Sequence, residues 1–147
     1  FLVSGGTGNV WINMAFGKPV VSADFYLLNA GSIAFCTVPN VVIPRMYWFK
    51  DEKRFLTMSE ILECCRFYQW KDNCQRDGIE HVPNSAEDIC EAADELNKRL
   101  DEEWEDLPED IDLRDRFQNL YLPYHEGYGL KTHLSSAFLR QNADLIQ

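Results

Sequence analysis

The chain has 147 residues, of which 46% are apolar, and it carries a net charge of −10. This length suffices for one domain with its own core, and the phosphates of nucleic acid would be repelled by so acidic a chain. No apolar run approaches the roughly 20 residues that span a bilayer. We therefore expect neither a nucleic-acid partner nor a transmembrane segment.

The acidity is concentrated in the second half of the chain. Residues 1–80 carry eight acidic and eight basic side chains, whereas residues 81–147 carry sixteen acidic and six basic ones. Residues 101–115 alone contain nine acids and one arginine, and we interpret this run as a solvated helix face and linker. An anionic ligand is therefore expected in the neutral first half.

The cysteines and histidines form no disulfide or metal pattern. The chain has five cysteines; their number is odd, two are adjacent, and no C-x-x-C pair exists. This pattern favours reduced, mostly buried thiols in a cytosolic protein. His81, His125 and His133 have no metal-ligand spacing with a carboxylate or a cysteine, so we interpret the histidines as structural and expect no metal site.

The first 22 residues predict a strand, a glycine-rich turn, a helix and a second strand. Residues 1–4 are predicted to form a buried strand, and residues 8–16 a short helix. Gly17 ends this helix because a residue without a Cβ adopts positive φ at low cost, and Pro19 precedes the second strand. A crossover of this length is a βαβ unit, so we predict a parallel sheet.

The middle of the chain is less regular. We expect a loop at residues 24–31 and an edge strand at residues 41–44. A charged turn is expected at residues 50–54, and a short strand or extended link at residues 79–82. Thr57 and Glu60 have the spacing of a capping box. They predict a helix that begins there and continues to about Cys74.

Helices dominate the remainder. Ser85 is a predicted N-cap, and the apolar stripe of the helix behind it is formed by Ile89, Ala92, Ala93, Leu96 and Leu100. A further helix follows Pro108, and residues 135–142 are predicted to form the last one. The predicted fold is α/β: the C-terminal part of a Rossmann-like domain, with a small parallel sheet and additional C-terminal helices.

The glycine-rich turn is the strongest candidate for a binding site. A strand that feeds a helix through small residues leaves the first N–H groups of the helix free to bind a phosphate. The residues concerned are Gly5, Gly6, Thr7, Gly8 and Asn9. They match neither the dinucleotide fingerprint nor the ATP-binding P-loop, and a purely structural turn is the alternative.

Short sequence blocks along the chain resemble a family of bacterial GT-B-like glycosyltransferases linked to surface polysaccharide synthesis. These enzymes consist of two Rossmann-like domains. The blocks occur in the same order as in the family and are F-G-K-P-V at 16–20, I-P-R at 43–45, R-F-L-T at 54–57 with E-I-L at 60–62, N-S-A-E-D-I at 84–89, and F-L-R-Q-N-A-D-L at 138–145.

The resemblance implies that residues 1–147 are the C-terminal, nucleotide-sugar-binding part of such an enzyme, and that an N-terminal acceptor half precedes them. It implies a nucleotide-diphosphate sugar as substrate, a glycan or lipid-linked acceptor, and transfer without a metal or other cofactor. A cytoplasmic location follows, with peripheral association at the inner membrane as an alternative. The catalytic residues stay unassigned, and we expect the fragment alone to be inactive.

Further candidate ligand-binding residues follow the second and third strands. Asp24 is expected to orient a sugar hydroxyl and Tyr26 to stack on the ligand, since both follow a strand whose carboxyl end faces the crevice. A basic cluster is formed by Arg45, Lys50, Lys53 and Arg54. Arg45 is our candidate for stabilising the departing diphosphate. An ordinary solvated loop is the alternative for each.

Two other function classes stay open. One is a non-catalytic α/β module for protein interaction, in which the glycine turn is only structural. The other is a different Rossmann-type nucleotide-binding enzyme, which would bind NAD or a nucleoside monophosphate.

Overall fold

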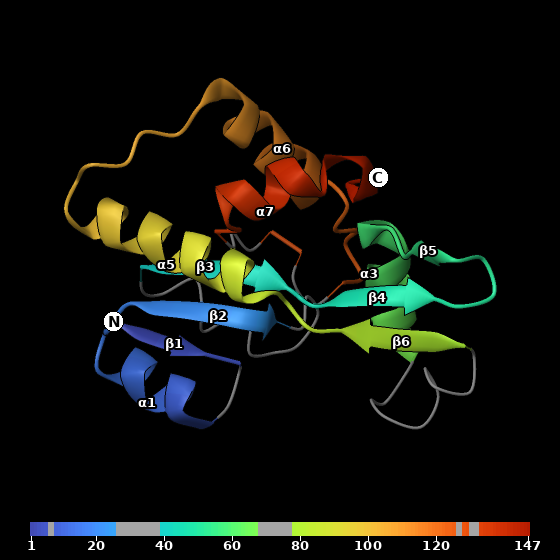
Figure 1. The fold of residues 1–147 in the computed structure, drawn as a ribbon, viewed down its shortest axis with the longest axis horizontal. Helices are drawn as coiled ribbons and strands as arrows, with labels where there is room; N and C mark the ends of the chain where they lie inside the picture. Colours follow the sequence, from blue (N-terminus) through green and yellow to red (C-terminus); the bar gives the residue numbers. More distant parts are fainter. Residues whose placement is uncertain (6–7, 26–38, 68–77, 126–127, 130–132) are drawn as a thin grey trace.

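The computed structural model describes residues 1–5, 8–25, 39–67, 78–125, 128–129 and 133–147. Over these residues the chain is α/β, with two three-stranded sheets and several helices (Figure 1). The third strand of the first sheet leads, after the single residue Arg45, into the first strand of the second. The α/β class and the small parallel sheet expected from the sequence are therefore confirmed.

The first sheet is parallel throughout and has the order β1-β2-β3. Its strands are β1 (Leu2–Ser4), β2 (Val20–Phe25) and β3 (Asn40–Pro44), and helix α1 (Gly8–Ala15) connects the first two. Gly17 follows α1 with a φ of +63°, the left-handed conformation expected of it. This confirms the predicted βαβ unit.

The burial of these strands differs from the prediction. Strand β1 was expected to be buried, but Phe1 and Val3 are 54% and 44% exposed, because among the described residues β1 pairs only with β2. Residues 41–44, expected to form an edge strand, lie in β3 at one end of the described strand order, but every residue of β3 is buried. An extended segment lies along its outer side, where the Val42 amide donates to the His133 carbonyl at 2.9 Å and Ser135 donates to Val42 at 3.0 Å.

The second sheet is antiparallel and has the order β5-β4-β6. Its strands are β4 (Met46–Phe49), β5 (Arg54–Phe55) and β6 (Ile79–Val82). The charged turn at residues 50–54 is confirmed as the connection between β4 and β5, and β6 is one of the two predicted alternatives for its segment. The sequence analysis missed β4, whose aromatic residues have no polar alternation that would indicate a strand.

Four helices complete the described structure. They are α3 (Met58–Phe67), α5 (Ala86–Leu100), α6 (Pro108–Gln118) and α7 (Ser136–Gln141), followed by a short 3₁₀ turn (Ala143–Leu145). Helix α5 lies along the parallel sheet and contacts β2 and β3, and α7 packs against both α5 and α6 (Figure 1). The predicted additional C-terminal helices are therefore present, and α5 is the one that packs on the parallel sheet.

Both predicted helix starts are confirmed. Ser85 accepts from the Asp88 amide at 3.1 Å, and Asp88 accepts from the Ser85 amide at 2.9 Å, which is a complete capping box. Glu60 likewise accepts from the Thr57 amide at 2.8 Å. The part of the predicted helix beyond Phe67 lies outside the described residues.

One burial prediction in the C-terminal half was wrong. Leu100, assigned to the apolar stripe of α5, is 41% exposed because the helix ends there and the chain turns away. Cys90 is exposed on the outer face of the same helix, and the burial of the other four cysteines, expected to be mostly buried, lies outside what the structure describes. The buried face of α5 includes Ala92 and Leu96, as predicted, and also Glu95, which was not.

Candidate functional site

The carboxyl ends of the three parallel strands meet at one edge of the first sheet. Gly5 follows β1, Asp24 lies near the end of β2, and Arg45 follows β3. The Arg45 amide donates to the Phe25 carbonyl at 2.9 Å, so the ends of β2 and β3 stay together. In open α/β sheets this edge is where ligands usually bind, and three of the candidate residues lie on it.

Asp24 differs in its setting from the prediction. It lies within β2 rather than in a loop, its φ is +49°, and the register between β2 and β3 shifts between Ser22 and Phe25. A positive φ is uncommon for a residue with a Cβ and often occurs at functional sites. The strained conformation turns the Asp24 amide out of the regular ladder, and it donates to Asn84 Oδ1 at 2.6 Å.

Asn84 fixes this conformation from a distant part of the chain. Its own amide donates to Asp24 Oδ1 at 3.1 Å, so the two residues are paired in both directions. The side-chain Nδ2 of Asn84 also donates to the Pro44 carbonyl at 3.0 Å. Asn84, which directly precedes the N-cap of α5, therefore bonds to the ends of both β2 and β3.

A histidine completes the cluster. His81 of β6 has its Nε2 atom 3.1 Å from Asp24 Oδ1, and the two side chains are 33% and 25% exposed. Its ring lies 6.1 Å from that of Tyr47. Because a carboxylate orients an imidazole through one ring nitrogen, the pair presents oriented polar atoms to solvent beside the carboxyl edge.

His81 and Asn84 were not among the candidate residues from the sequence. Their partner Asp24 lies 57 and 60 positions away, so no local spacing connects them. The N-S-A-E-D-I block that includes Asn84 was recognised, but only as a helix start.

Of the five residues of the glycine turn, the structure describes Gly5, Gly8 and Asn9. Gly6, Thr7 and Tyr26 lie outside the described residues. Gly5 is exposed, and a Cβ added to it would meet no atom within 4 Å, so the folded chain itself does not require glycine there. Gly8 and Asn9 form the first residues of α1, which has no acidic side chain in its first turn. The first amides of α1 and the space beside Gly5 are therefore compatible with a phosphate group.

The members of the basic cluster differ in where they lie. Arg54 donates to both carboxylate oxygens of Glu60, at 2.7 and 2.8 Å, and also to Glu52. Lys50 forms an ion pair with Glu80, and Lys53 is exposed in the turn between β4 and β5. Only Arg45 of these four follows a strand of the parallel sheet, and this position at the carboxyl edge makes it the candidate for an anionic ligand.

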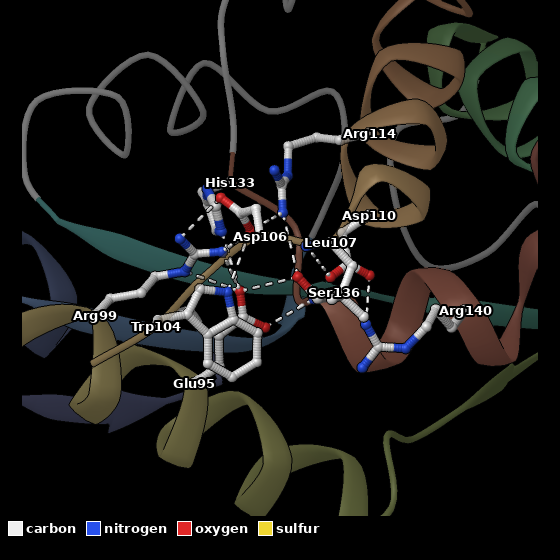
Figure 2. Close-up of polar contacts among 10 residues, drawn as sticks. All are labelled: Glu95, Arg99, Trp104, Asp106, Leu107, Asp110, Arg114, His133, Ser136 and Arg140. Atoms are coloured by element: carbon white, nitrogen blue, oxygen red, sulfur yellow. Dashed lines mark hydrogen bonds and ion pairs between the residues drawn. The ribbon is translucent and has the colours of Figure 1, made fainter. Parts of the chain in front are cut away.

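A second cluster of charges lies between α5 and α7 and was missed by the sequence analysis (Figure 2). Its centre is Glu95, which is 1% exposed. The carboxylate accepts from the Ser136 amide at 2.7 Å, from Arg99 Nε at 3.0 Å, and lies 3.0 Å from His133 Nε2. Burial would raise the pKa of Glu95, but these hydrogen bonds hold it below the ordinary value.

The acidic run supplies further carboxylates to the same region. Asp106 accepts from Arg99 and, at 3.2 Å, from Arg114, and the hydrogen bond from Arg99 lowers its pKa most strongly. Asp110, which is completely buried, pairs with Arg140 of α7. The prediction that residues 101–115 form only a solvated face and linker was therefore wrong. We interpret the cluster as structural, because its carboxylates are occupied by cations of the same chain.

No known protein or protein family was found to be similar to this chain. Comparisons with protein-family models, with curated proteins and with solved structures each return no match. Within the described parts of the chain there is no group of three or more potential metal ligands. None of the described helices is both long and apolar enough to cross a membrane.

Proposed function

We propose that this chain binds a nucleotide-diphosphate sugar at the carboxyl edge of its parallel sheet. It is the donor-binding part of a Rossmann-like, GT-B type glycosyltransferase that acts in surface polysaccharide synthesis. The glycan or lipid-linked acceptor is bound chiefly by an N-terminal half. The observation that carries the proposal is the meeting of Gly5, Asp24 and Arg45 at one sheet edge.

Each of these groups has a role in donor binding. The first amides of α1 bind the diphosphate, aided by the positive end of the helix dipole. Arg45 offsets the charge that develops on the nucleotide diphosphate as it leaves, which is electrostatic stabilisation of the transition state. Asp24, held by Asn84, accepts a hydrogen bond from a sugar hydroxyl. No step of this mechanism requires a metal ion.

Nucleotide titration followed by amide chemical shifts tests the proposal. On addition of UDP or GDP we expect shifts at Gly5, Gly8, Asn9 and Arg45, and Arg45→Ala should weaken binding about tenfold, the loss of one charge-assisted contact. Lys50→Ala is the matched control, because Lys50 is paired with Glu80 and lies at the far end of β4. If folded protein shows no shift at millimolar nucleotide, the proposal is wrong.

One observation favours a second candidate, a non-catalytic interaction module. Four large apolar residues in or next to β1 and α1 are 44% to 75% exposed: Phe1, Val3, Ile12 and Phe16. Within the described residues β1 pairs on one side only, and apolar side chains beside such a strand edge are typical of a surface that packs against another protein segment. A titration in which UDP and GDP have no effect would favour this candidate, and binding of NAD or a nucleoside monophosphate would favour another Rossmann-type enzyme.

A further inference from the structure

A groove separate from the carboxyl edge lies between the β4–β5 hairpin, the start of α3 and the C-terminal residues 141–147. Its volume is about 1000 Å³, at the upper end of the range found for ligand sites. It shares no residue with the cluster of Asp24, His81, Asn84 and Arg45. The groove is therefore a second site, whose chemistry can be considered independently of the nucleotide.

Two aromatic side chains, Trp48 and Phe55, line this groove. Trp48 of β4 and Phe55 of β5 are directly paired across the antiparallel ladder, and their rings meet edge to face with centroids 5.1 Å apart. Both side chains are only half-buried and line the groove. Because they project from paired strands, the rings are held in place without a ligand.

Polar groups line the rest of the groove. Glu60 is fixed by Arg54 and by the Thr57 amide, and the hydrogen bonds from Arg54 lower the pKa of its carboxyl to about 2. Glu60 is therefore ionised near neutral pH and accepts hydrogen bonds only. The neutral amides of Gln141 and Asn142 also line the groove. Gln141 Nε2 donates to Glu91 and Asn142 Nδ2 donates to the Phe138 carbonyl, and each amide keeps a second N–H donor and an acceptor oxygen.

The charges of the lining exclude most other ligand classes. Arg54 is the one basic side chain among the lining residues, against the acids Glu60 and Asp144, and it is already bound to two carboxylates. A phosphate or a uronic acid would have to displace Glu60 or Glu52 from Arg54, and would meet the remaining negative charge. A purely apolar ligand would remove water from the carboxylate and the amides without offering hydrogen bonds in exchange.

A neutral sugar satisfies both parts of the lining. The C–H face of a pyranose ring is apolar and covers an aromatic ring, whereas its hydroxyls donate to carboxylates and both donate to and accept from amides. We infer that this groove binds a neutral oligosaccharide, with one sugar ring stacked on Trp48 and its hydroxyls hydrogen-bonded to Glu60 and Gln141. This inference does not require that the carboxyl edge bind a nucleotide sugar.

A glycan array carrying neutral, sialylated and uronic-acid-containing oligosaccharides tests the inference, with the complete chain as the probe. We expect binding to neutral glycans. Trp48→Ala should weaken the strongest of these interactions about tenfold, from the loss of the stacked surface. Trp48→Phe should retain part of it, because the smaller ring still stacks. Tyr128→Ala is the matched control, since Tyr128 is 56% exposed and lines a different hollow.

Because Trp48→Ala removes part of a strand pair, Gln141→Ala provides a second test on the opposite side of the groove. Its side chain is exposed, so folding is unaffected, and we expect a loss of about threefold in affinity. The inference is overturned if no neutral glycan binds, if only acidic glycans bind, or if both folded variants bind as the unaltered chain does. Failure of UDP and GDP to bind would leave these results unchanged and would count only against the donor site.

Discussion

The chain contains two carboxylate–histidine pairs that are alike in geometry and unlike in setting. Asp24 and His81 lie 3.1 Å apart, and Glu95 and His133 lie 3.0 Å apart. The side chain of Asp24 is 25% exposed, however, whereas that of Glu95 is 1% exposed. The difference lies in what else each carboxylate contacts.

The Glu95 carboxylate is closed to a ligand, because it is buried and both of its oxygens are engaged within the chain. Its Oε2 atom accepts from the Ser136 amide, and its Oε1 atom accepts from Arg99 and contacts His133. In the Asp24 carboxylate the contacts within the described residues fall on Oδ1, and the side chain is partly exposed, which leaves Oδ2 open to a hydroxyl or to water. Burial of the carboxylate, rather than the presence of a histidine, therefore separates a structural pair from a candidate binding pair.

The largest effect is expected from Glu95→Ala. This substitution leaves Arg99 and His133 without their buried partner and the Ser136 amide without an acceptor, and breaking such a pair typically costs about 3–5 kcal/mol. Chemical denaturation measures the free energy of unfolding. Glu91→Ala, on the exposed face of the same helix, should change it by less than about 0.5 kcal/mol. A loss below about 1 kcal/mol for Glu95→Ala would contradict the structural interpretation of this pair.

Acid should destabilise the protein through the carboxylates that are paired with arginines in the folded state, which are Glu60, Glu95 and Asp106. The pKa values of Glu95 and Asp106 lie below their ordinary values in the folded state, and that of Glu60 falls from 4.5 to about 2. A group with a lowered folded-state pKa contributes its stability fully above the ordinary value and loses it as the pH falls toward the folded one. The free energy of unfolding should therefore decline between pH 4.5 and about 2.

The contribution of Glu95 to this acid dependence can be measured separately. Glu95→Ala should show a shallower decline than the unaltered chain, because one of the titrating groups has been removed. Denaturation curves at a series of pH values, recorded for both proteins, provide the measurement. Equal slopes would mean that Glu95 does not contribute to the acid lability.

Asp24→Asn tests the partly exposed pair. The amide keeps an oxygen for the Asn84 amide and has nearly the same shape, so we expect the free energy of unfolding to fall by only about 1 kcal/mol. Affinity for a UDP-sugar should fall about tenfold, because the charged acceptor for a sugar hydroxyl is lost. Calorimetric titration measures the affinity. Large destabilisation with unchanged affinity would place Asp24 with Glu95 as a structural residue.

The smallest effect is expected from Ser85→Ala, at the start of the helix that connects the two pairs. Loss of this N-cap should cost about 1 kcal/mol. Hydrogen exchange should accelerate at the first turn of α5, next to Asn84, and much less around Glu95, more than two turns farther along the helix. Uniform acceleration along α5 would show that the two pairs are coupled through the helix.

Much of the fold could be predicted because its signals are local. The βαβ unit is indicated by Gly17 and Pro19, and the starts of α3 and α5 by capping residues three positions apart. The antiparallel sheet could not be predicted in this way, because β4 pairs with β6 across more than thirty residues and its partner is decided by packing. The exposure of Phe1 and Val3 likewise depends on which strands lie beside β1.

The candidate site was predicted in part. Asp24 and Arg45 were identified because strand ends are local features, and the parallel sheet brings them to one edge. His81 and Asn84 reach Asp24 only through the tertiary fold. Glu95 carried a signal that was overlooked: it lies on the helix face of Ala92 and Arg99, so a charge on the buried stripe required a buried partner.

The segment after His133 has a consequence for synthesis of the protein. Among the described residues, the outer partner of strand β3 is the segment around Leu134. A ribosome adds Leu134 roughly ninety residues after Pro44, or on the order of ten seconds later at about 5–20 residues per second. During that interval an apolar strand emerges with one side unpaired, a state that attracts other nascent chains. We expect expression at low temperature, or with holding chaperones, to raise the yield of folded protein.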